Sequence, residues 1–215
     1  MKNTKTLKMV ETAIFIALVL VLSFVPFVGY IKIPVLAIQA TTVHIPVIVG
    51  SILLGPKAGS VLGFTFGLTS LINNTITPGI TSFCFSPFIQ MGENLGGSPL
   101  ALIVCFVPRI LVGIVPYYVY TGLMKLFKNG SVKKGIALTI SGIAGSMTNT
   151  ILVMGMIYVF FGHEWAAAKE MAYNAVLGVI GSVIAINGSI EAVVAAIITT
   201  AVALALMKAK LFKEK

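Results

Sequence analysis

The chain has 215 residues, of which 58% are hydrophobic and 10% are charged, with a formal net charge of +9 at pH 7 and a mean hydropathy of +1.04. A soluble domain usually has about 25% charged residues, so this chain has too few charges to cover a surface exposed to water. The composition excludes a soluble globular protein and predicts a single polytopic membrane domain over residues 1–215.

Apolar stretches recur along the chain between Lys, Pro, Gly or Asn residues, and six of them are candidates to cross a bilayer as helices. We therefore predict an all-α fold with six transmembrane helices. The predicted spans are 7–28, 42–54, 58–72, 100–126, 135–161 and 182–207. The second and third are short for a bilayer unless they are tilted. The stretch 163–178 predicts an interfacial or half-buried helix before the sixth span.

The first span has the basic start and apolar core of a secretory signal. No small-residue cleavage site ends that core, so we expect the span to be retained as a helix. Ala13 and Ala17 form an A-x-x-x-A pattern, which lets another helix backbone approach closely. This face is a candidate docking groove for a partner, and packing inside the protein is the alternative.

Two polar side chains lie between the first and second spans. Gln39 ends a short apolar segment, 30–39, that could fold over the mouth of a binding site. His44 opens the second span near the expected outer surface. Both are candidate ligand contacts, although a histidine at the interface is often only hydrated.

The third span combines a small-residue face with a polar stripe. Thr69 and Asn73 follow Thr65 at four-residue spacing, so the three share one helix face, and with Asn74 they give three candidate ligand contacts, Thr69, Asn73 and Asn74. Threonine within a span more often bonds to its own helix backbone, which is the alternative for Thr69. The small-residue face, which favours close packing inside the protein, consists of Gly59, Gly63 and Gly67.

A long loop, 73–99, follows the third span. It is rich in Gly, Pro, Thr and Ser and contains an apolar patch at 83–88. Loops of this length are usually functional or mobile. The loop predicts a lid over an outer binding site, and a disordered connector is the alternative.

The fourth span contains the only arginine of the chain, Arg109, within an otherwise apolar stretch. A rise of 1.5 Å per residue from the outer end of the span places it about 14 Å into the membrane. An ionised group at this depth is expensive unless it is paired or hydrated, so it is a functional candidate. Its planar fork suits a carboxylate, and a structural ion pair with Glu191 is the alternative. Tyr117 shares its helix face.

The fifth and sixth spans add Asn149, Asn187 and Glu191. Asn149 and Glu191 reach a depth similar to that of Arg109, and Asn187 lies nearer the outside. The polar residues together predict a ligand chamber in the outer half of the membrane, closed toward the cytoplasm. Two alternatives remain, because amides also bond helices to each other and Glu191 can serve to position Arg109.

The basic residues are Arg109 and fourteen lysines, and the lysines predict the orientation. Twelve of them fall on one side of a six-span topology, and Lys32 and Lys169 fall on the other. By the positive-inside rule both termini are cytoplasmic. The net positive charge is thus explained by topology, and no nucleic-acid partner is expected.

Several catalytic signatures are absent from the sequence. It has no G-x-x-x-x-G-K-[ST], H-E-x-x-H or G-x-S-x-G motif and no aspartate. Cys84 and Cys105 lack the spacing of a metal site or of a disulfide framework. We therefore predict no catalytic residues, no metal site, no cofactor bound by this chain and no enzyme activity.

The chain resembles the substrate-binding S components of energy-coupling factor (ECF) vitamin transporters over nearly its whole length. The resemblance rests on the six spans, on Ala13 and Ala17, and on the block HIPVIVGSILLGPKAGSVLGFTFGLTSLINN with the later TSFCFSPF, which is most similar to the pantothenate-type branch. It implies tight vitamin binding in the outer half of the bacterial cytoplasmic membrane. It also implies docking through the first span onto a transmembrane coupling protein with two ATPase subunits, which would use the ATP, and toppling to release the vitamin inside.

Pantothenate is a small anion with one carboxylate, one amide and two hydroxyls, which suits the predicted chamber. Arg109 would take the carboxylate, and Tyr117, Asn149, Asn187 and Glu191 would meet the amide and hydroxyls. The alternatives are an S component for riboflavin, pyridoxine, hydroxymethylpyrimidine or folate, and a self-sufficient secondary carrier with Glu191 as its protonation site. A membrane enzyme using His44 and Glu191 is the most remote interpretation.

Overall fold

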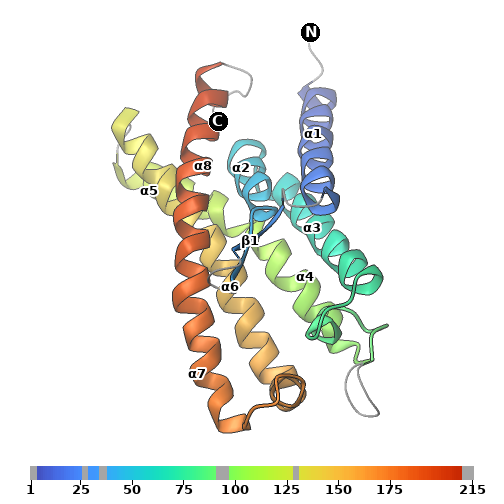
Figure 1. The fold of residues 1–215 in the computed structure, drawn as a ribbon. Helices are drawn as coiled ribbons and strands as arrows, with labels where there is room; N and C mark the ends of the chain where they lie inside the picture. Colours follow the sequence, from blue (N-terminus) through green and yellow to red (C-terminus); the bar gives the residue numbers. More distant parts are fainter. Residues whose placement is uncertain (1–3, 26–28, 34–37, 91–96, 128–130, 210–215) are drawn as a thin grey trace.

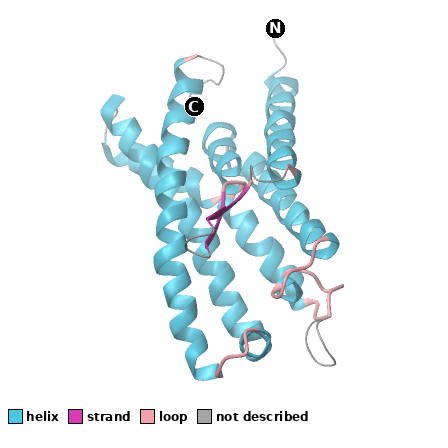
Figure 2. Ribbon diagram, in the orientation of Figure 1, coloured by secondary structure: helices cyan, strands magenta, loops and turns pink. Residues whose placement is uncertain are grey.

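The computed structural model describes residues 4–25, 29–33, 38–90, 97–127 and 131–209, which form a bundle of helices with one short hairpin (Figures 1 and 2). The elements are, in chain order, α1 (Thr4–Phe24), β1 (Tyr30–Ile33), β2 (Ile38–Thr41), α2 (His44–Leu54), α3 (Pro56–Ile76), the 3-10 helix η2 (Ser82–Cys84), α4 (Leu100–Val112), α5 (Val115–Phe127), α6 (Ser131–Ala168), α7 (Tyr173–Val183), the π-helical turn η3 (Ile184–Gly188) and α8 (Ser189–Lys208).

Within the described residues, four helical runs are long and apolar enough to cross a membrane: Lys5–Phe24, Leu100–Phe127, Val132–Ala168 and Tyr173–Lys208. These runs contain most or all of the predicted first, fourth, fifth and sixth spans. Of the two shorter predictions, α2 is an apolar helix of 11 residues and α3 a helix of 21 residues. The helical fold is confirmed, and the count of six spans stays a prediction.

The hairpin is a departure from the all-α prediction. β1 and β2 pair antiparallel, with Tyr30 opposite Thr41 and Ile33 opposite Ile38. The segment is rich in isoleucine, which favours strands because its branched side chain packs well on a pleated surface. The hairpin lies among the helices rather than beyond their ends, as Figure 2 shows.

The stretch 163–178 does not form the single helix that was predicted. Residues 163–168 continue α6 past a kink at Phe161, which has non-helical dihedral angles. The chain then turns at Glu170, whose φ is 53°, and α7 starts at Tyr173. The alanines at 166–168 favour continuation of the helix, and the reversal at Glu170 sends the chain back along α6. The helical run that contains the sixth predicted span therefore begins at Tyr173, nine residues before the predicted start of that span.

The helical run that contains the predicted fourth span has a break inside it. α4 ends at Val112 and α5 begins at Val115, and between them Ile114 N–H donates to Leu111 O at 2.9 Å in a tighter, 3-10 type turn. Pro116 then occupies the first turn of α5, where the missing N–H of proline has no intrahelical partner to lose. The break lets α5 leave the direction of α4 (Figure 1).

The glycine face of α3 packs inside the protein, as predicted. A Cβ added to Gly59 would overlap the carbonyl oxygen of Gly113, and one added to Gly63 would overlap the carbonyl oxygen of Arg109. α3 and α4 therefore approach each other backbone to backbone. This contact fixes how α3 is rotated about its own axis relative to α4.

Buried apolar side chains form two clusters. One includes Phe15 of α1, Ile48 of α2 and Leu62 of α3, and the other includes Phe83 of η2 and Ile157 of α6. Phe83 is fully buried. The centre of the described loop, residues 82–86, is thus packed against the helices, which disfavours a disordered connector, the alternative for 73–99.

Candidate functional site

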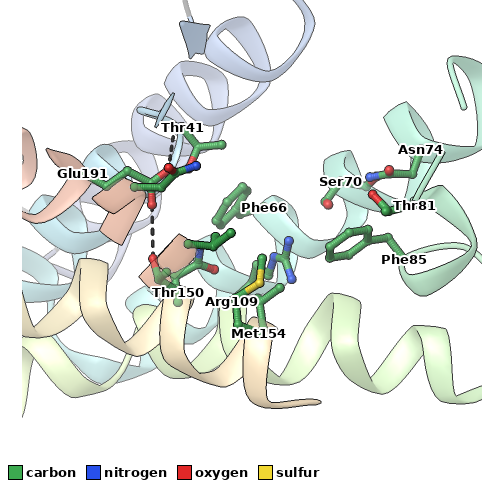
Figure 3. Close-up of a pocket in the computed structure, with 14 residues that line it drawn as sticks. Thr41, Phe66, Ser70, Asn74, Thr81, Phe85, Arg109, Thr150, Met154 and Glu191 are labelled. Atoms are coloured by element: carbon green, nitrogen blue, oxygen red, sulfur yellow. Dashed lines mark hydrogen bonds between the residues drawn. The ribbon is translucent and has the colours of Figure 1, made fainter. Parts of the chain in front are cut away.

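A cavity of about 310 Å³ lies among the helices, near the lower end of the range of roughly 300 to 1,000 Å³ typical of small-molecule sites. Figure 3 shows the side chains that surround it, which come from β2, from α3, from the residues on either side of η2, and from α4, α6, α7, η3 and α8. They are Thr41, Phe66, Ser70, Asn74, Thr81, Phe85, Arg109, Asn149, Thr150, Val153, Met154, Val183, Asn187 and Glu191.

Glu191 forms the acidic side of the cavity. Its Oε1 accepts hydrogen bonds from the backbone N–H of Thr41 at 2.8 Å and from Thr41 Oγ1 at 2.9 Å. Its Oε2 accepts a hydrogen bond from Thr150 Oγ1 at 3.1 Å. The carboxylate therefore joins the end of the hairpin to α6 and α8, as the dashed lines in Figure 3 show.

Arg109 projects from α4 between two aromatic rings. Its guanidinium carbon lies 5.6 Å from the centre of the Phe66 ring and 5.2 Å from that of Phe85, both within the range of cation–π attraction. Its Nη1 donates to the carbonyl oxygen of Val104 at 2.8 Å. The side chain is only 7% exposed, so a positive charge is held inside the protein at a defined place.

The far side of the cavity is built by α3 and the loop that follows it. Asn74 Nδ2 donates to the carbonyl oxygen of Ser70 at 2.8 Å, and Asn74 Oδ1 accepts from Ser82 Oγ at 2.7 Å. These bonds tie η2 to the end of α3. They hold the adjacent loop residues Thr81 and Phe85 at the cavity wall (Figure 3).

Asn149 of α6 carries a buried acceptor. The residue is 9% exposed, and its Oδ1 makes no hydrogen bond within the described part of the chain. A buried acceptor without a donor destabilises a protein by about 1–3 kcal/mol, so such a group in a cavity wall is suited to a ligand donor. Asn187 lines the same cavity from η3.

Five of the ten predicted ligand contacts line the cavity: Asn74, Arg109, Asn149, Asn187 and Glu191. Thr69 and Asn73 instead tie α3 to α1, because Thr69 Oγ1 accepts from Ser23 Oγ at 2.9 Å and Asn73 Nδ2 donates to Ser23 O at 2.9 Å.

The remaining three predicted contacts are His44, Tyr117 and Gln39. His44 is only 1% exposed, so it is more buried than expected for a residue at the membrane interface. It is not among the residues that line the cavity. Tyr117 packs edge to face on Tyr118, with ring centres 5.5 Å apart. Gln39 pairs with Lys32 through the backbone, and its side chain lies outside the described residues.

Several lining residues were not predicted from the sequence. Two of them are Phe66 and Ser70 of α3. With Asn74, which was predicted, they form a four-residue repeat one position after the repeat of Thr65, Thr69 and Asn73. They lie seven residues after Gly59, Gly63 and Gly67, and positions seven apart lie on nearly the same helix face. The glycine face therefore contained a usable signal. Thr41 and Phe85 come from non-helical segments, where no periodicity marks them.

Apolar helices around a small polar cavity are typical of membrane proteins that bind a small polar solute. The family model of the ECF transporter substrate-specific component matches residues 7–203, and the chain belongs to this family. It is 39% identical over 213 residues to a pantothenic acid transporter, PanT, of Lactococcus lactis subsp. cremoris, with 98% of each chain covered.

A second relative is a pantothenate transporter, PanT, of Leuconostoc mesenteroides subsp. mesenteroides. It is 26% identical over 204 residues, which cover 94% of this chain and 93% of the relative. The family membership and these relatives make the chain a multi-pass transport protein of the bacterial plasma membrane, not an enzyme.

Proposed function

We propose that the chain binds pantothenate as the substrate-specific component of an ECF importer. Both relatives bear the names of pantothenate transporters, and one covers 98% of the chain. The main support for this is the cavity itself. There one buried cation, Arg109, lies among side chains that form hydrogen bonds and a few apolar side chains. A small monoanion with hydroxyl and amide groups matches this combination.

The chemistry of the cavity favours one orientation of the vitamin. The carboxylate would lie on Arg109, because a guanidinium donates two parallel hydrogen bonds to a carboxylate. The hydroxyls would donate to Glu191, and the amide N–H would donate to Asn149 Oδ1. The geminal methyl groups of the vitamin would then contact apolar wall residues such as Val153 and Val183.

We further propose that the chain forms one six-span domain with α2 and α3 as its two shorter spans and with both termini cytoplasmic. The start of α1 and the end of α8 lie at the same end of the molecule, and the turn between α6 and α7 lies at the opposite end (Figure 1). The hairpin and the loop at 77–90 would then cover the cavity from the outside. The bonds from Thr41 to Glu191 support a hairpin that closes over the site.

Transport would require the partners of the family. Ala13 and Ala17 are exposed on α1, which suits a close approach by a helix of a transmembrane coupling protein with two ATPase subunits. ATP would be used by those ATPases, and we propose no cofactor for this chain. Lipid would cover the remaining apolar surface, such as Val193 and Ile197 of α8.

The test is calorimetric titration of the detergent-purified chain alone with pantothenate, and with riboflavin, pyridoxine and thiamine as controls. We expect tight one-to-one binding of pantothenate without nucleotide or partner. Binding of a control vitamin in its place would overturn the substrate. A folded chain that binds none of the four would overturn the capture function.

A further inference from the structure

Pro108 lies in the interior of α4, as the ninth of its 13 residues and directly before Arg109. In an α-helix the N–H of each residue donates to the carbonyl four residues earlier. Proline has no N–H, so the carbonyl of Val104 loses the donor that residue 108 would supply. That carbonyl is the one that accepts from Arg109 Nη1, at 2.8 Å.

This bond has a consequence for the charge in the cavity. The opposite charge that lines the same cavity is Glu191, whose two oxygens accept from Thr41 and Thr150. A guanidinium turned toward Glu191 would be neutralised by it, and the cavity would lose its preference for anions. The Val104 carbonyl holds the guanidinium on the α4 side, between the rings of Phe66 and Phe85.

We propose that Pro108 is a positioning residue that makes the cavity selective for a ligand with a free carboxylate. The inference rests on the proposed function and adds the determinant of selectivity to it. The proline acts through Arg109, because it leaves the Val104 carbonyl without a backbone donor and this carbonyl holds the guanidinium in place. The ligand class is a monoanion whose carboxylate is neither reduced nor joined to a further group.

The test measures a ratio of affinities in the detergent-purified full chain. The two probes are pantothenate and pantothenol, in which a hydroxymethyl group replaces the carboxylate. The unaltered chain is expected to bind pantothenate about tenfold to hundredfold more tightly than pantothenol, as for loss of a charge-assisted hydrogen bond. In Pro108→Ala the restored N–H competes for the Val104 carbonyl, and this ratio is expected to fall by about threefold to tenfold with pantothenol affinity unchanged.

Two controls separate positioning from folding. Pro108→Ala is expected to fold, because alanine is favourable inside a helix where proline is not. Pro116→Ala changes a second buried proline, in the first turn of α5, where no carbonyl depends on the missing N–H; the affinity ratio should stay as in the unaltered chain. In an Arg109→Gln background, Pro108→Ala should no longer change the ratio, because the two residues act through one guanidinium.

The outcomes distinguish this inference from the proposed function. An unaltered chain that binds no pantothenate overturns the proposed function, and this inference with it. An unaltered chain that prefers pantothenate, together with an unchanged ratio in Pro108→Ala, overturns the inference alone. The inference alone is also overturned if Pro108→Ala weakens both ligands equally, or if its effect persists in the Arg109→Gln background.

Discussion

At the scale of single residues, the cavity contains two opposite charges, Glu191 and Arg109, which contact different groups of the protein. Glu191 is held by neutral donors from β2 and α6, and Arg109 by a backbone carbonyl and two aromatic rings. The neutral donors stabilise the Glu191 carboxylate without cancelling its charge. Arg109 and Glu191 together therefore suit a ligand that carries a carboxylate at one end and hydroxyl donors at the other.

Arg109→Lys tests whether the guanidinium binds the carboxylate of pantothenate. Lysine keeps the charge but loses the planar fork and its contacts with both rings. We expect pantothenate affinity to fall by about 10- to 100-fold, measured by calorimetry. Lys57→Ala, a change at an exposed basic residue on α3, should leave the affinity unchanged. Full pantothenate affinity in Arg109→Lys would contradict the proposed contact between the carboxylate and Arg109.

Cys84 gives a residue-scale test of packing in the loop after α3. The thiol is fully buried, and its burial, with a smaller effect of the negative charge of Glu164, raises its pKa from 9.0 to about 12. In a Cys105→Ser variant, the remaining thiol should react with a disulfide reagent at pH 8 far more slowly in the native than in the denatured chain, since the thiolate is the nucleophile. Fast reaction in the native chain would mean that η2 is not packed as described.

At the scale of elements, helix rotation decides which side chains reach the cavity. On α3 the glycine face lies against α4, which directs Phe66, Ser70 and Asn74 toward the cavity and leaves Thr69 and Asn73 for α1. On the last helix, Val183, Asn187 and Glu191 line the cavity although they are eight residues apart in all.

The π-helical turn η3 explains that alignment. In a regular α-helix each step of four residues advances about 40° beyond one full turn, so two steps would drift by about 80°. The i to i+5 bonding of a π turn adds residues to a turn and reduces the drift. Asn187 lies within η3 and Glu191 just after it. Such turns often occur at functional sites.

Gly63→Ala tests the contact of α3 with α4. The added Cβ would overlap the backbone of Arg109, so the two helices must separate. We expect about 1–3 kcal/mol of destabilisation, typical of overpacking, and weaker pantothenate binding. Unfolding can be followed by the fluorescence of Trp165, which is buried. Gly155→Ala on α6, where a Cβ meets nothing within 4 Å, should not destabilise the chain; equal effects of the two changes would contradict the contact.

At the scale of the whole molecule, capture and transport are expected to use different surfaces. The cavity is enclosed by elements from β2 to α8, whereas α1 supplies none of its lining residues. Much of the surface of α1 is exposed, including Ala13 and Ala17. A change on that surface can therefore affect docking without touching the cavity.

The double change Ala13→Trp and Ala17→Trp tests this separation. Two indoles on the small-residue face should prevent a close helix approach. We expect vitamin uptake by cells carrying the coupling protein and ATPases to be lost, while the purified chain keeps its pantothenate affinity. The matched control is Val193→Trp with Ile197→Trp, which are also four apart and exposed on α8. Normal uptake in the α1 variant would argue against docking through Ala13 and Ala17.

Composition and spacing alone determined that this chain is a helical membrane protein and that Arg109, Asn149, Asn187 and Glu191 belong together. The reason is physical: a polar side chain in an apolar span is expensive, so its position along the helix indicates a depth at which such groups meet. That argument uses only distance along a helix, which a sequence contains. The resemblance to the S components was likewise visible in residues 44–74 and is confirmed by the family match.

The tertiary structure decided how the helices are rotated and where the loops lie, which distance along a helix does not indicate. It selected one polar stripe of α3 over its neighbour, because backbone contact at Gly59 and Gly63 sets the rotation of that helix. It brought Thr41 and Phe85 to the cavity from non-helical segments, and it gave Arg109 the Val104 carbonyl as an acceptor. Loop placement follows from packing between residues far apart in the chain, and no local periodicity records it. The glycines of α3 mark a face for close packing, but the sequence does not say which helix packs against that face.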